Sequence, residues 1–202
     1  MRTSPKSAAP AAGFRQPVFD SQATFRVILD AMAHPGRVLH LPLRPDPVGA
    51  LGPAAVAVAL ALVDNDTRVW LDPGAKTEPV GDFLRFHCGC AFAERPEDAT
   101  FAFVSEPRTC VPLWSFGLGT PEYPDRSSTV ILQVDNLEDG GRGARLTGPG
   151  IETEAHLSVS PLSDGFWDQA KANHSFFPLG IDILFVCGDR IAALPRSTAI
   201  EV

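Results

Sequence analysis

Residues 177–202 read FPLGIDILFVCGDRIAALPRSTAIEV, with two short apolar runs on either side of Gly188 and Asp189. This pattern predicts a β-hairpin, because strand-forming residues flank a short turn that contains glycine. A hairpin does not require Asp182 within the first run, nor Arg196 shortly after the second run. A charged residue in such a run must face water, find a partner or serve a site. The pair is therefore a candidate either for a functional site or for a buried salt bridge with no catalytic role.

Toward the N-terminus, helical and strand patterns alternate along the chain. The clearest strands are predicted at residues 100–105 and 129–134, which are rich in β-branched, aromatic and aliphatic side chains. Residues 53–63 are apolar on nearly every side, which predicts a helix buried on most of its faces. Other helices are predicted through Phe25, Ile28, Leu29 and Met32, at 79–87 and at 164–173, and other strands at 38–41, 67–71 and 144–147. This mixture favours an α/β protein with a mixed sheet.

The length of 202 residues suits a single domain. Residues 1–16 are rich in alanine, proline and serine, so they are expected to form a flexible N-terminal tail. The domain is then expected to span residues 17–202. Within it, Asp20 or Ser21 is expected to cap the first helix, and Ser163 the last.

Charge and hydropathy argue against two classes of protein. The net charge of −7 disfavours binding to nucleic acid through its phosphates, which takes a basic surface. The longest apolar run, residues 54–63, is too short to span a bilayer, and the first residues lack the apolar core of a signal peptide. The chain is therefore expected to be cytoplasmic and to bind neither nucleic acid nor a membrane.

A first candidate anion site follows the strand predicted at residues 144–147. Thr147, Gly148 and Gly150 belong to a Thr-Gly-Pro-Gly sequence, whose glycines leave backbone N–H groups open to approach. Arg145 adds a positive charge nearby, so the group suits phosphate or phosphonate. The alternative is a tight turn beside a surface arginine, because short turn motifs are common.

A second candidate lies at the end of the helix predicted at 79–87. Arg85 and His87 could bind an anion there, or His87 could act as an acid or base. Cys88 and Cys90 follow directly, but a zinc site would need two more ligands from distant cysteines, so no metal is expected. The cysteines also lack the spacing of an iron–sulfur cluster. The role of Cys88 and Cys90 stays open.

Several blocks of the chain, taken together, resemble one family. They are FRVILDAMAHPGRV, LVDNDTRVWL, LRFH, PEDATFAFV, STVILQV, RLTGPGI and FPLGIDILFVCGDRIAALPRST, and they follow one another in the family's order. These blocks are similar to the PhnH subunit of the bacterial carbon–phosphorus lyase machinery. The resemblance covers roughly residues 17–202 and leaves out only the N-terminal tail.

The resemblance implies a role in phosphonate degradation. PhnH-like proteins work with PhnG, PhnI and PhnL to transfer a phosphonate to the ribose C1′ of ATP, which releases adenine and gives a ribose 1-phosphonate 5-triphosphate. They form a core complex with PhnG, PhnI and PhnJ, and PhnJ, the iron–sulfur radical subunit, later cuts the carbon–phosphorus bond. By their place in the matched blocks, the candidate residues for binding substrate or anion are Arg85, His87, Arg145, Thr147, Gly148, Gly150, Asp182 and Arg196. No catalytic residue is assigned.

Alternatively, the chain belongs to the same complex but takes no part in the reaction. The chain would then be a scaffold with a vestigial cofactor cleft, and it would dock PhnG and PhnI. The long loop at residues 106–128 offers Trp114, Phe116 and Tyr123 as a docking surface, because aromatic side chains often anchor interfaces. Alternatively, this loop is a lid that packs on the core of the same chain and docks no partner.

The resemblance also implies a fold and an oligomeric state. The fold is a three-layer α/β/α arrangement with a mixed sheet, similar to the large domain of pyridoxal-phosphate-dependent transferases, in a homodimer without that cofactor. The three lysines agree with this, because a Schiff base needs a buried, activated lysine. Lys6 lies in the tail, Lys76 in a turn and Lys171 on a polar helix face. Neither pyridoxal phosphate nor an iron–sulfur cluster is therefore expected in this subunit.

Overall fold

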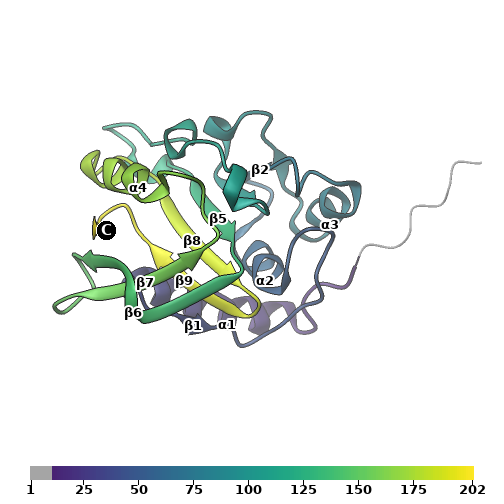
Figure 1. The fold of residues 1–202 in the computed structure, drawn as a ribbon. Helices are drawn as coiled ribbons and strands as arrows, with labels where there is room; N and C mark the ends of the chain where they lie inside the picture. The colour runs from purple at the N-terminus through teal and green to yellow at the C-terminus, as the bar shows by residue number, and fades with distance from the viewer. Residues whose placement is uncertain (1–10) are drawn as a thin grey trace, which may run out of the picture.

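The computed structural model describes residues 11–202, and within them a seven-stranded mixed sheet forms the centre of the molecule (Figure 1). The strand order is β1-β9-β8-β5-β4-β2-β3. The helices are α1 (Pro17–Ala33), α2 (Pro53–Leu62), α3 (Glu78–Cys88) and α4 (Phe166–Ser175). The strands of this sheet are β1 (Leu39–His40), β2 (Arg68–Leu71), β3 (Ala91–Phe92), β4 (Phe101–Val104), β5 (Thr129–Gln133), β8 (Asp182–Cys187) and β9 (Arg190–Leu194). The mixed α/β class predicted from the sequence is confirmed.

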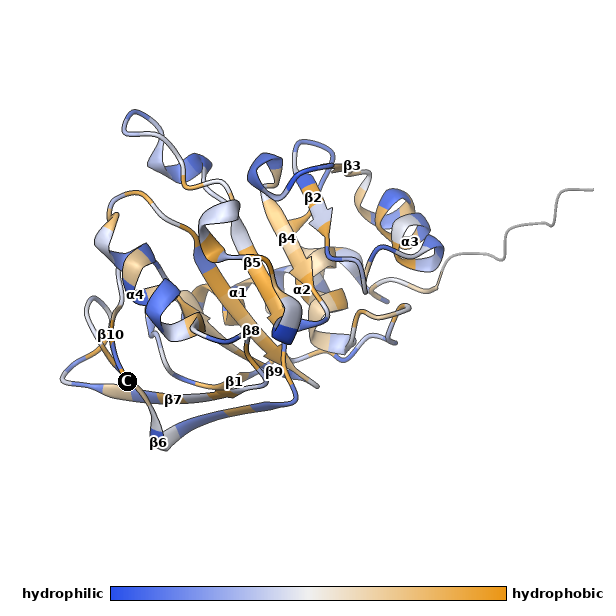
Figure 2. Ribbon diagram, turned by 45° about the horizontal axis from the view of Figure 1, so that its top comes forward, coloured by the Kyte–Doolittle hydropathy of each residue, from blue (hydrophilic) through white to orange (hydrophobic). Residues whose placement is uncertain are grey.

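The central strands β4, β5 and β8 run parallel to one another and are hydrophobic along most of their length (Figure 2). Nearly continuous apolar runs are typical of parallel strands that are covered on both faces. Side chains alternate between those faces along each strand. In β8, Leu184 and Val186 pack with the first core cluster, whereas Ile183 and Phe185 pack with the second. The sheet thus separates two cores.

The first core lies between the sheet and the helices α1, α2 and α3. Helix α2 sits at its centre, and residues from Ala54 to Ala59 are almost completely buried. An apolar surface on every side suits such a helix, so its predicted burial is confirmed. Helix α1 packs against α2 and β9, and its buried face carries Thr24, Ile28 and Ala31. Phe25 and Leu29, which share the predicted helical spacing, point to solvent instead.

The opposite face of the sheet is covered by α4 and by a small second sheet. That sheet has the order β10-β6-β7 and is formed by β6 (Asn136–Thr147), β7 (Ala155–Ser160) and β10 (Ala199–Glu201). A layer of helices was expected on this face. That prediction is confirmed only in part, because the second sheet covers the face together with α4. Only residues 144–147 of this sheet were predicted as a strand. The rest of β6 was not predicted, because the sequence Asp-Gly-Gly-Arg-Gly at 139–143 is not typical of a strand. In the structure this sequence forms an irregular bulge opposite Leu157.

The C-terminal hairpin is confirmed. Strand β8 pairs antiparallel with β9, and Cys187 faces Arg190 across the turn. Gly188 has a φ of 64°, a conformation that glycine adopts without steric cost. The chain then continues into β10, which pairs with β6, so the last residues join the two sheets.

Both predicted helix caps are wrong. Helix α1 begins at Pro17, with Gln16 at the N-cap, and the Asp20 side chain accepts a hydrogen bond from the Gln16 backbone N–H at 2.8 Å. Proline at the first helical position starts the helix earlier than the polar residues suggested. Helix α4 begins after Gly165 rather than after Ser163, which contributes only a backbone carbonyl.

The predicted tail falls mostly on residues 1–10, which lie outside the described residues. Phe116, which was expected in a docking loop, is instead buried and meets the ring of Trp70 edge-on at 5.8 Å. The same loop leaves Trp114 and Tyr123 exposed. Among the described helices, none has the length and apolar character needed to cross a membrane.

Candidate functional site

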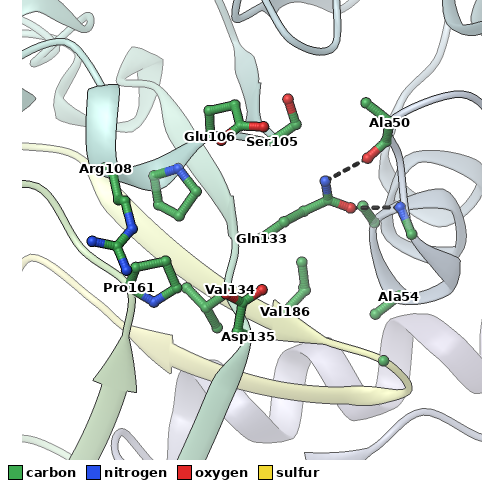
Figure 3. A pocket seen from close by; sticks show the side chains of 14 residues that line it. Ala50, Ala54, Ser105, Glu106, Arg108, Gln133, Val134, Asp135, Pro161 and Val186 are labelled. Carbon is green, nitrogen blue, oxygen red and sulfur yellow. Dashed lines mark hydrogen bonds between the residues drawn. The ribbon is translucent and has the colours of Figure 1, made fainter.

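A cavity of about 360 Å³ opens where β4, β5 and β8 reach their carboxyl ends (Figure 3). We call it the carboxyl-edge cleft. One wall is the segment at 105–108 after β4, and a second is the end of β5 at 133–135. The first turn of α2 and Gly188 of the hairpin close the opposite side. In open α/β sheets, ligands bind in the crevice outside the carboxyl ends of the strands, so this is the expected place for a site.

Gln133 fixes the first turn of α2 against the sheet. Its side-chain Nε2 donates to the carbonyl of Ala50 at 2.7 Å, and its Oε1 accepts from the N–H of Gly52 (Figure 3). The N–H of Ala54 donates to the carbonyl of Gly188 at 3.1 Å. Three elements of the cleft are therefore tied together by hydrogen bonds, which gives the cleft a preformed shape.

A buried carboxylate that the sequence did not reveal supports the other wall. Asp72 follows β2, and only 4% of its surface is exposed. Its two oxygens accept the backbone N–H groups of Ala75, Ser105 and Glu106 at 2.8–3.0 Å, and also the Ser105 hydroxyl. Several hydrogen bonds compensate a buried charge. Asp72 thus holds the start of the 105–108 segment, which carries Arg108.

Three charged side chains lie at the cleft without an ion pair among residues 11–202. Arg108 and Glu106 come from the segment after β4, and Asp135 lies two residues after the end of β5 (Figure 3). All three are exposed, and none takes part in the salt bridges within the described residues. A guanidinium without a carboxylate partner can pair with an anion from solution. Sequence patterns missed all three residues.

Cys88 and Cys110 lie in surroundings that keep their thiols protonated. Burial raises the pKa of Cys110 to about 12, and the nearby negative charge of Asp72 adds to the effect. Burial, followed by the charges of Cys90 and Asp64, raises the pKa of Cys88 to about 12. Metal binding and nucleophilic attack both require the thiolate. In the stretch from residue 11 to the C-terminus, no group of three or more His, Cys, Asp or Glu side chains is placed to hold a metal ion.

Asp182 and Arg196 form a partly buried pair at the amino end of β8, at the opposite edge of the sheet from the cleft. Their side chains are 16% and 14% exposed, and Arg196 Nη2 lies 2.6 Å from Asp182 Oδ2. The Arg196 guanidinium also donates to the carbonyl of Pro124 at 2.7 Å and to the hydroxyl of Ser127. His174 bonds the Arg196 carbonyl at 3.0 Å. These contacts join a loop, a strand and a helix, as a structural pair would.

Arg145, Thr147, Gly148 and Gly150 lie in and after β6 on the second sheet. The exposed guanidinium of Arg145 is held by Glu154 and Glu201, each within hydrogen-bonding distance. These bonds raise the pKa of Arg145, and the bond from Arg145 lowers that of Glu154. Gly150 packs against the last carbonyl of α1, that of Ala33. One side of the glycine turn therefore faces the end of α1, and anion binding by its backbone N–H groups stays a prediction.

Arg85 and His87 lie near the end of α3 but belong to different surroundings. Arg85 lines a second cavity, of about 440 Å³, where it pairs with Asp82 at 3.3 Å and lies 4.9 Å from the ring centre of Phe92. His87 donates from Nε2 to the carbonyl of Ala11 at 2.8 Å. The predicted residues thus occupy three separate regions, none of which is the carboxyl-edge cleft. Their binding roles stay predictions.

The fold and the cleft together define a mixed α/β protein with a ligand-sized site at the carboxyl edge of its sheet. A sequence profile of the family described as "Bacterial phosphonate metabolism protein (PhnH)" matches residues 12–201. The chain therefore belongs to the PhnH family of bacterial phosphonate metabolism proteins. The resemblance noted from the sequence blocks is confirmed.

Two curated relatives are similar over nearly their whole length. The alpha-D-ribose 1-methylphosphonate 5-triphosphate synthase subunit PhnH of Rhizobium meliloti (strain 1021) is 37% identical over 188 residues, which cover 93% of this chain and 94% of the relative. The putative C-P lyase subunit protein HtxG of Stutzerimonas stutzeri is 33% identical over 185 residues, which cover 90% and 86%.

Proposed function

We propose that this chain is a subunit of a multi-subunit complex that transfers an alkylphosphonate to the ribose C1′ of ATP with release of adenine. The names of the two relatives support membership of such a complex, since both are described as subunits. We further propose that the carboxyl-edge cleft contacts the complex's substrates. The observation that carries this step is Arg108, an exposed guanidinium at the cleft with no ion-pair partner among residues 11–202.

The chemistry of the reaction fits a subunit that supplies binding rather than proton transfer. Both substrates carry oxyanions, which a guanidinium binds with two parallel hydrogen bonds. Displacement of adenine builds positive charge on the ribose, and carboxylates of the assembled complex would stabilise it. The complex is expected to complete the site with residues of its other subunits, PhnG, PhnI and PhnJ.

Replacing Arg108 by alanine tests the proposed site. In the complex reconstituted with Arg108→Ala, the rate of adenine release from ATP and phosphonate is expected to fall at least about tenfold. The reason is that a substrate oxyanion loses its charged hydrogen bond to the Arg108 guanidinium. The matched control is Arg26→Ala, which removes an exposed arginine of α1 that does not line the cleft. Equal activity of both variants, with the complex intact, would rule out the cleft and favour a scaffold.

The scaffold alternative has an observation of its own. Val18, Phe19, Phe25 and Leu29 of α1 are all exposed, between 46% and 78%. Val18, Phe25 and Leu29 lie on one side of the helix by their spacing, and such apolar faces mark interaction sites. Under this alternative, the face packs on a partner subunit of the complex, and the PhnG and PhnI subunits are the expected partners.

Charge on the α1 face should therefore prevent assembly. The double variant Phe25→Asp with Leu29→Asp is expected to lose co-purification with the partner subunits while keeping its own fold, because the altered side chains are solvent-exposed in the free chain. Phe86→Asp is the control, since Phe86 is 69% exposed on α3. Assembly at the wild-type level in the double variant would exclude this face.

We also propose that the subunit works without pyridoxal phosphate. Of the described lysines, Lys76 is 67% exposed beside Glu94, and Lys171 lies on α4. Neither lines the carboxyl-edge cleft, so neither is placed for a Schiff base there. The likeness to the large domain of pyridoxal-phosphate-dependent transferases and the homodimer stay predictions from the family resemblance.

A further inference from the structure

The carboxyl-edge cleft carries charges of both signs. Its ionisable side chains are Arg108, Glu106 and Asp135, which give it one positive and two negative groups. Glu106 and Arg108 flank Pro107 in one segment, whereas Asp135 projects from the neighbouring strand end (Figure 3). None of the three is neutralised by another side chain of residues 11–202, so each is open to a ligand.

This charge pattern discriminates between classes of ligand. A triphosphate would meet one cation and two carboxylates, and like charges brought together at a binding site are costly. A neutral sugar would leave the guanidinium without a counter-charge. A small molecule with an oxyanion at one end and an ammonium group at the other would pair with both kinds of group at once.

The size and the walls of the cleft agree with a small zwitterion. A volume of about 360 Å³ lies at the lower end of the range for small-molecule sites. Pro161, Val186 and Ala54 provide apolar wall between the charged groups. A short alkyl chain can pack there while its two ends reach the charges.

We propose that the carboxyl-edge cleft binds a phosphonate that carries an ammonium group, with the phosphonate on Arg108 and the ammonium group on Asp135 and Glu106. The inference rests on the proposed function, because it takes the cleft as the place where this subunit meets the phosphonate substrate. It adds that the cleft selects the phosphonate and leaves the nucleotide to other subunits.

Calorimetric titration of the full chain and of the assembled complex tests the proposal with four probes: 2-aminoethylphosphonate, ethylphosphonate, β-alanine and tripolyphosphate. 2-Aminoethylphosphonate is expected to bind at least about tenfold more tightly than ethylphosphonate, since it adds a charged hydrogen bond. Equal affinity for ethylphosphonate would overturn the proposal, and so would tighter binding of tripolyphosphate. If β-alanine binds as tightly as 2-aminoethylphosphonate, the assignment to phosphonates is wrong. If none of the probes binds to the chain or to the complex, the whole proposal is wrong.

Two variants assign the ends of the ligand. Asp135→Asn is expected to reduce the preference for the ammonium group and to leave the affinity for ethylphosphonate unchanged, whereas Arg108→Ala is expected to weaken both phosphonates. Glu122→Gln, at an exposed carboxylate of the 106–128 loop outside the cleft lining, is the matched control. A preference that survives Asp135→Asn and Glu106→Gln together would also refute the proposal.

The same variants separate this inference from the proposed function. If Arg108→Ala abolishes adenine release but the wild-type complex shows no preference for an ammonium group, only the inference fails. If Arg108→Ala leaves adenine release unchanged, the cleft is not the substrate site. The proposed substrate-binding role of the cleft is then wrong, whatever its preference for ammonium groups.

Discussion

Replacement of Arg196 by methionine is expected to lower the free energy of unfolding by about 3 kcal/mol, the lower end of the cost of removing one partner of a buried ion pair, because this pair is only partly buried. The variant leaves the Asp182 carboxylate buried without its guanidinium, although its Oδ1 still accepts the backbone N–H of residue 196 at 2.9 Å. It also leaves the Pro124 carbonyl and the Ser127 hydroxyl without their donor. Urea denaturation of the wild type and of Arg196→Met measures the difference.

Arg145→Met is the matched control for this prediction. Arg145 is also held by two carboxylates, Glu154 and Glu201, but its side chain is 40% exposed. Water and salt screen such a surface pair, so the midpoint of urea denaturation is expected to stay where it is in the wild type. Equal losses of stability in the two variants would contradict the structural role assigned to the Asp182–Arg196 pair.

Replacement of Gly150 by alanine is expected to cost about 3 kcal/mol or more, which places it among the strongly destabilising substitutions. Gly150 has a φ of 83°, a left-handed conformation that a Cβ atom disfavours. A Cβ at this position would also overlap the carbonyl of Ala33, the last residue of α1. Because that obstacle is backbone, it cannot rotate away, and the turn and the helix end must separate. Differential scanning calorimetry measures the loss.

Gly165→Ala separates the two parts of this effect. Gly165 has a φ of 69°, close to that of Gly150, but a Cβ there would meet nothing within 4 Å. Its substitution is expected to cost only the backbone term, about 1–2 kcal/mol. If both variants lose the same stability, close packing of the turn on α1 is not the reason for glycine at 150.

The sequence predicted those elements whose character is local. The β8–β9 hairpin follows from two apolar runs around Gly188, and α2 follows from an unbroken apolar surface. Strands β7 and β10 and most of β6 were not predicted, because their residues are mixed in polarity and their pairing depends on distant segments. The spacing of Phe25, Ile28, Leu29 and Met32 predicted helix α1 but not which of its faces is buried. Helical spacing places side chains on a common side, but only the tertiary contacts decide which side is buried.

Sequence patterns could not predict the carboxyl-edge cleft, because it too depends on tertiary contacts between distant segments. Arg108, Glu106 and Asp135 stand in ordinary loop contexts, and only the parallel order of β4, β5 and β8 brings the segments together. One available signal was topological, since the ends of buried parallel strands carry sites. Asp72 gave a further signal, a carboxylate followed by proline and glycine directly after a strand.

The pairing of β1 with β9 has a consequence for synthesis on the ribosome. Strand β1 is made early, but its partner in the sheet is β9, and α1 also packs on β9 near the end of the chain. Contacts between segments so distant in sequence form slowly, because a long loop must close first. The nascent chain therefore keeps β1 unpaired, and α1 without its contacts to β9, until almost all of it has been translated. A chain released before residue 190 lacks the strand that secures its own N-terminal region.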